Sequence, residues 1–253
     1  MDELRPSNFR MIYFALKIDW VLTLILPLVF FGLLFALDQQ LRGSGIASSD
    51  IGIQEFALAS IPLTRLLYAY FAVRYCASGL CSLLAVKGLG DIRTFPAKLI
   101  ASRKWFTVCM LMNAVAMAAR IIHISLNFSD FAGPLRSIYP VTQAVTLALL
   151  GLATYTLAKG YGEVFESIGE QKASVRANTL ARWVPAAFIA FDAAYITFMT
   201  DLLPEGLPGG LLNTLLILFM LTFCFCMAVR FKVICCAKTI WKTLTVISDE
   251  VTL

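Results

Sequence analysis

The sequence predicts an all-helical (all-α) polytopic integral membrane protein, a bundle of six transmembrane helices with both termini in the cytoplasm. The 253 residues are 59% hydrophobic and only 15% charged, and their mean hydropathy is +0.79. A soluble domain has about 25% charged residues. The apolar residues also gather in long runs between short polar segments. We therefore expect residues 1–253 to form a single transmembrane domain, with no room for a second sizeable soluble one.

Each apolar run comes close to, or exceeds, the roughly 20 residues that a helix needs to cross a bilayer. The first run is longer than the core of a signal peptide and precedes no small-residue cleavage site, so we expect it to be retained. The predicted spans are about 18–37, 56–86, 104–128, 138–158, 183–203 and 211–231.

Two further segments have a helical pattern outside the spans. In residues 159–181, Tyr161, Val164, Phe165 and Ile168 recur at helical spacing among glutamates. This predicts an amphipathic cytoplasmic segment that continues the fourth span. Residues 232–253 form a basic tail with interleaved apolar side chains, including Trp241. That composition is typical of an interfacial helix lying on the membrane surface.

The basic residues orient the chain. Most of the 21 Lys and Arg residues fall in the N-terminal segment, the second and fourth loops and the tail, whereas the opposite side has only Arg42 and Arg136. Because cytoplasmic loops are enriched in Lys and Arg, both termini are predicted to be cytoplasmic in a multi-pass protein of the cell (inner or plasma) membrane. Arg74 and Arg230 lie near inner span ends and are expected to snorkel to the surface.

The third span carries a polar stripe. Asn113, Arg120, His123 and Asn127 recur at spacings of seven, three and four, and Cys109 lies four residues before Asn113. At about 3.6 residues per turn these positions share one face of the helix. Lipid would not tolerate a charge there, so the stripe should face the bundle interior. It either lines a cavity or makes hydrogen bonds between helices.

Asp192 lies near the middle of the fifth span and is the only carboxylate predicted to be embedded in the membrane. Arg65, in the second span, has a similar predicted depth. An isolated charge would cost at least about 2.5–3.5 kcal/mol, so pairing is expected. We predict an Arg65–Asp192 pair, with Arg120 as the second candidate partner. The pair either belongs to a substrate site or holds the helices in register.

The small residues and the cysteines indicate less about function than the charged residues do. Ala186, Ala190 and Ala194 repeat every four residues, as do Ala144 and Ala148, and this spacing allows close helix approach. All seven cysteines fall in predicted spans or at their inner ends, so no structural disulfide is expected. The chain has a single histidine, and the spacings of its cysteines do not match the ligand patterns of zinc sites. We predict no metal site and no cofactor.

The first functional hypothesis is a membrane transport component, namely a small transporter, a channel-like protein or a permease subunit. The sequence contains no H-E-x-x-H, G-x-S-x-G or Walker lysine motif, so we do not expect an enzyme. Two arginines against one aspartate favour an anionic or zwitterionic solute. The predicted cavity is lined by Arg65, Tyr68, Asn113, Arg120, His123 and Asp192.

The alternative is a non-catalytic membrane partner that anchors, assembles or regulates another protein. Segment 159–181 and the basic tail would then be docking surfaces. A homo-oligomer through the small-residue faces is also open. Membrane orientation explains the net charge of +5, so the lipid bilayer is expected as a partner and nucleic acid is not.

Overall fold

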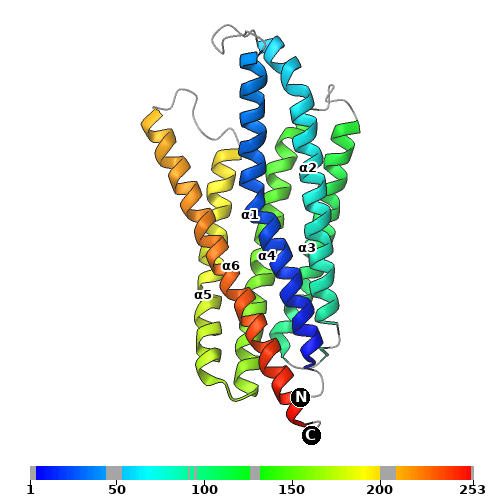
Figure 1. The fold of residues 1–253 in the computed structure, drawn as a ribbon, viewed down its shortest axis with the longest axis vertical. Helices are drawn as coiled ribbons and strands as arrows, with labels where there is room; N and C mark the ends of the chain where they lie inside the picture. Colours follow the sequence, from blue (N-terminus) through cyan, green and yellow to red (C-terminus); the bar gives the residue numbers. More distant parts are fainter. Residues whose placement is uncertain are drawn as a thin grey trace.

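The chain folds into an antiparallel helical bundle. The computed structural model describes residues 4–43, 53–90, 92–93, 96–125, 132–199 and 209–251. Within these residues every regular element is an α-helix, as the sequence predicts. Each helix runs antiparallel to the one before it, and α1 begins where α6 ends (Figure 1). We call this end of the bundle the terminal end. The helices are α1 (Pro6–Gly43), α2 (Ile53–Gly88), α3 (Ala97–Ser125), α4 (Ala132–Ser167), α5 (Gln171–Met199) and α6 (Gly209–Val251).

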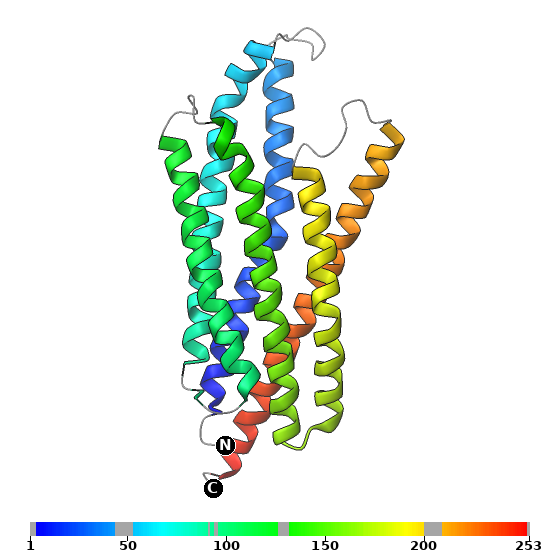
Figure 2. The same cartoon turned by 180° about the vertical axis from the view of Figure 1, so that it is seen from behind.

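The helices close into a ring. Each helix packs against its neighbours in sequence, and α1 packs against α6. Helix α4 also contacts α6, so it touches three other helices. From behind, α3, α4 and α5 lie side by side (Figure 2). Residues from every helix can therefore meet in one interior.

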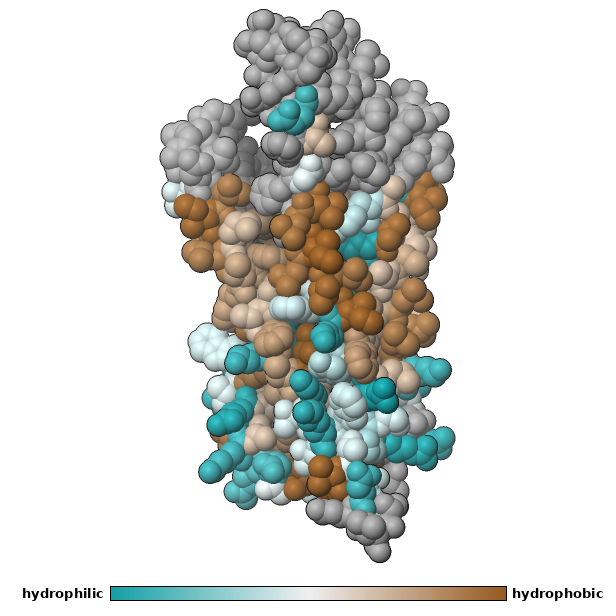
Figure 3. Space-filling model, viewed as in Figure 1, coloured by the Kyte–Doolittle hydropathy of each residue, from teal (hydrophilic) through white to brown (hydrophobic). Residues whose placement is uncertain are grey.

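Within the described part of the chain, four helices are long and apolar enough to cross a membrane, and this indicates a membrane protein. Large apolar side chains such as Leu28, Val73, Ile189 and Leu221 are exposed on the bundle. Figure 3 shows a wide apolar band above a polar region near the terminal end. Helices α1 and α5 are outside this set, for which only the described residues were considered. The four segments are Ala69–Gly88, Ala97–Ile122, Val141–Ser167 and Thr214–Asp249.

The predicted extension of the fourth span is present but shorter than expected. Helix α4 ends at Ser167, and the turn that follows contains Gly169, whose φ is +82°. The Glu170 amide donates to the Phe165 carbonyl at 2.8 Å. This bond, with the left-handed glycine, is a Schellman cap that stops the helix. Residues 171–181 consequently belong to α5.

The basic tail is not a separate helix on the surface. Helix α6 continues without a break to Val251. Its buried positions include Val233, Ala237, Ile240 and Leu244, which lie on one face because they are spaced by three or four residues. The Trp241 ring also lies 6.0 Å from the Tyr13 ring. The tail keeps the helical phase of the preceding span, so it packs along α1 inside the bundle.

The predicted small-residue faces are only partly buried. Ala186 and Ala148 are exposed and Ala144, Ala190 and Ala194 are half-buried, whereas Ala177, Ala181 and Ala187 of α5 are fully buried. A close helix approach occurs at a glycine. A Cβ at Gly160 would lie 2.5 Å from Leu99 Cδ2, so α4 and α3 can meet there only without a side chain.

Candidate functional site: a polar interior

A buried ion pair joins the first and last helices. Arg230 of α6 pairs with the Asp19 carboxylate of α1, and each residue is only 7% exposed. Arg230 Nη1 also donates to Thr23 Oγ1 at 3.3 Å. Arg74 of α2 reaches the same hydroxyl, with 3.4 Å between Nη2 and Oγ1. We call Asp19, Thr23, Arg74 and Arg230 the Asp19 cluster.

The expectation that Arg230 snorkels is wrong. The guanidinium points inward because Asp19, Thr23 and the Met227 sulfur supply its acceptors. Trp20 reinforces the contact, since its Nε1 donates to the Met227 carbonyl at 2.9 Å. Asp19 is also a second carboxylate inside the bundle, in addition to Asp192.

A signal for this pair was present in the sequence. The buried positions Phe9, Ile12 and Leu16 of α1 are spaced by three and four residues, and Asp19 and Thr23 continue that spacing. In α6, Arg230 similarly continues the series from Phe223 and Cys226 to Val233 and Ile240. Such a pattern marks the inner face of a packed helix pair. A charged residue that shares the helical spacing of buried apolar residues is expected to be buried as well. This spacing is a better guide to burial than the distance from the end of the span.

A second polar group lies between α2, α3, α4 and α5. The Tyr75 hydroxyl donates to Gln143 Oε1, and both side chains are buried. The Arg120 guanidinium lies 5.1 Å from the Phe71 ring centroid. The Tyr195 phenol is within electrostatic range of Tyr75, Arg74, Arg120 and Asp192. Asp192 Oδ1 is buried and accepts no hydrogen bond within the described part of the chain. We call Tyr75, Arg120, Gln143, Asp192 and Tyr195 the central polar group.

Two of the predicted site residues, Arg120 and Asp192, both act electrostatically on the Tyr195 phenol. Whether they form one site stays a prediction. Asn113 lies on the same inner face of α3 as Arg120 and is 2% exposed, but its Nδ2 donates to the Cys109 carbonyl of its own helix at 2.8 Å. One hydrogen-bond donor of the Asn113 side chain is therefore already used within α3.

The other predicted site residues lie beyond what the structure describes. The side chains of Arg65, Tyr68 and His123 are outside the described residues, as is Asn127. The Arg65–Asp192 pair therefore remains a prediction. Tyr75, Gln143 and Tyr195 were not predicted, because single tyrosines and glutamines in a span are not distinguishable by type from residues of the membrane interface.

Arg230 is neutralised by Asp19. Arg74, Arg120 and Asp192 each act electrostatically on the Tyr195 phenol. Guanidinium and phenol groups donate hydrogen bonds, and charge-assisted bonds of this kind are strong away from water. All seven cysteines are free thiols. Across the described residues, no three His, Cys, Asp or Glu side chains gather as metal ligands would.

Comparisons with known proteins give no relative from which a function could be transferred. No protein-family model, curated protein or solved structure matches this chain. The functional argument consequently rests on the interior residues themselves.

Proposed function

We propose that the chain is a membrane transport component, a small transporter, channel-like protein or permease subunit whose interior accepts an anionic or zwitterionic solute. The observation that supports the proposal is that the Tyr195 phenol lies within electrostatic range of two arginines and one carboxylate, namely Arg120, Arg74 and Asp192. Ionisable side chains inside a membrane bundle are costly, and they commonly mark a substrate or ion pathway.

The proposed binding mode follows from the charges. Arg120 would bind a carboxylate or phosphate of the solute, and Tyr195 would donate to the same group. Asp192 would accept an ammonium group, since its Oδ1 is buried without a donor in the described structure. A zwitterion would thereby satisfy both signs of charge at once.

The proposal includes six spans with both termini in the cytoplasm of a cell-membrane protein. Exposed basic side chains near the terminal end support this orientation, because cytoplasmic segments are enriched in Lys and Arg. They include Arg10, Lys17, Lys104, Arg182 and Lys238. The polar surface at the terminal end agrees with that assignment (Figure 3).

Uptake into proteoliposomes tests the proposal. The purified protein is reconstituted and assayed with a panel of labelled small carboxylates, inorganic phosphate and amino acids. For any solute taken up, Arg120→Ala should abolish uptake while the variant remains monodisperse. Lys104→Ala is the matched control, because Lys104 is a cation on the same helix but is exposed. Uptake that survives Arg120→Ala, or loss of folding in that variant, would reject a solute-binding role for Arg120.

The second candidate function is a non-catalytic membrane partner. The apolar face of the predicted docking segment is already covered by the chain itself, since Tyr161, Val164 and Phe165 are buried. The exposed side chains that a partner could contact include the charged residues Glu166, Glu170 and Lys172. In this case Glu166→Gln with Glu170→Gln should remove a co-purifying protein from native membranes, whereas Arg120→Ala should leave it bound.

A further inference from the structure

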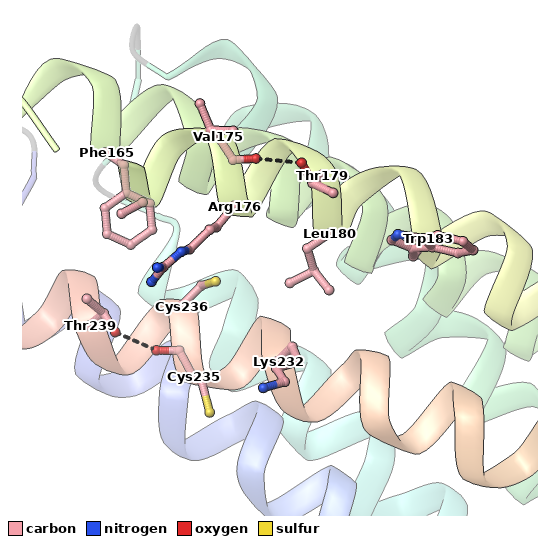
Figure 4. A pocket seen from close by; sticks show the side chains of 11 residues that line it. Phe165, Val175, Arg176, Thr179, Leu180, Trp183, Lys232, Cys235, Cys236 and Thr239 are labelled. Carbon is pink, nitrogen blue, oxygen red and sulfur yellow. Dashed lines mark hydrogen bonds between the residues drawn. The ribbon is translucent and has the colours of Figure 1, made fainter. Parts of the chain in front are cut away.

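A groove with two cations lies between α5 and α6 near the terminal end. Its volume is about 550 Å³, and the end of α4 closes one side (Figure 4). Arg176 extends from α5 toward α6, and Lys232 lies across the groove on α6. Both are exposed, and they are the only charged side chains among the described residues that line the groove. The groove therefore has a positive mouth with no carboxylate among the described residues that line it.

Beyond the cations, on the side away from the terminal end, the groove continues as an apolar track. A second cavity of about 250 Å³ shares Leu180, Trp183 and Lys232 with the first and extends along α6 to Phe225. Because α5 and α6 are antiparallel, the path from Leu180 to Trp183 and the path from Lys232 to Phe225 run in the same direction. Both lead away from the terminal end and toward the apolar band (Figures 1 and 3).

Two cations near the terminal end, followed by an apolar track, match the chemistry of one class of ligand. An anionic phospholipid has a phosphate at the membrane surface and an acyl chain that descends into the hydrocarbon. Basic residues near the surface attract anionic headgroups, and a tryptophan is favoured at the boundary between headgroups and hydrocarbon. Trp183 lies between the cations and the track and is 56% exposed. An inorganic anion would leave the apolar track without an occupant.

We propose that the α5–α6 groove binds one anionic phospholipid. Its phosphate lies between Arg176 and Lys232, and one acyl chain follows Leu180, Trp183, Phe225 and Val229. This site is separate from the central polar group, so the proposal requires membrane insertion but not the proposed transport function.

Native mass spectrometry of the full chain in mild detergent tests the site. Phosphatidylglycerol and phosphatidylcholine with the same acyl chains are titrated in parallel. The wild type should retain one phosphatidylglycerol, and Arg176→Gln with Lys232→Gln should weaken its binding roughly 30-fold, since each cation contributes about fivefold. The matched control is Arg182→Gln with Lys238→Gln, which removes two exposed cations that do not line the groove. Equal loss in both double variants, or equal binding of the two lipids, would overturn the proposal.

A second variant tests the track without changing charge. Ala228 lines the second cavity and is exposed, so Ala228→Trp should fill the track without disturbing the core. It should reduce phosphatidylglycerol retention while leaving the melting temperature unchanged. Inorganic phosphate should not displace the lipid. Full lipid retention in Ala228→Trp, or displacement by phosphate, would mean that the cations bind a free anion instead.

Discussion

Arg230 and Lys232 are two residues apart on α6, yet they have opposite surroundings. Arg230 is buried in an ion pair with Asp19, whereas Lys232 is exposed at the mouth of the α5–α6 groove. Successive helical residues are rotated by about 100°, so a step of two places side chains on nearly opposite faces. The comparison shows that helical phase, and not distance from the end of a span, decides whether a basic residue here is structural or available to a ligand.

The largest expected effect comes from breaking the inner pair. Asp19→Ala leaves the Arg230 guanidinium buried without its carboxylate. Removing one partner of a buried pair typically costs about 3–5 kcal/mol, because the remaining charge is uncompensated. Thermal unfolding in mild detergent, followed by circular dichroism, should show a large drop in melting temperature.

A double variant separates charge from shape at the same place. Asp19→Leu with Arg230→Met replaces both charged groups by apolar ones, which is often neutral or stabilising. Its melting temperature should return to the wild-type value or exceed it. If Asp19→Ala alone leaves stability unchanged, the pair does not hold α1 against α6.

An intermediate effect is expected where two helices meet at a glycine. Gly160→Ala would place its Cβ 2.5 Å from Leu99 Cδ2 and 3.0 Å from the Leu99 amide nitrogen. Overpacking of this kind typically costs about 1–3 kcal/mol. Gly32→Ala is the outward-facing control, because its Cβ would meet nothing within 4 Å. Equal melting temperatures for the two variants would show that α3 and α4 can separate at this point.

The smallest effect on stability is expected on the outer face. Lys232→Gln removes an exposed cation, and exposed substitutions usually change the free energy of unfolding by less than about 0.5 kcal/mol. The same variant should weaken phosphatidylglycerol binding about fivefold. If Lys232→Gln had a melting temperature as low as that of Asp19→Ala, the two faces of α6 would not differ in their contribution to stability.

Much of the fold follows from local pattern. Long apolar runs with few charges predict helices and membrane insertion, and the helical spacing of Tyr161, Val164 and Phe165 correctly predicted the continuation of α4. The inner face of α3 was also predicted, because Asn113 and Arg120 are seven residues apart. Properties of this kind depend on composition and on the period of a single helix, so they can be derived without knowing its neighbours.

The partners of the polar groups depended on the tertiary structure. Asp19 and Arg230 are 211 residues apart, and only the packing of α1 against α6 brings them together. The electrostatic influence of Arg120 on Tyr195 likewise depends on how α3 and α5 are placed in the bundle. The helical period shows which face of a helix is polar. The rotation of that helix about its axis, and its height in the bundle, are set by its contacts with the other helices. For this reason the sequence by itself determined the helices and their buried faces, and the tertiary structure decided which charges are paired and which lie open to a ligand.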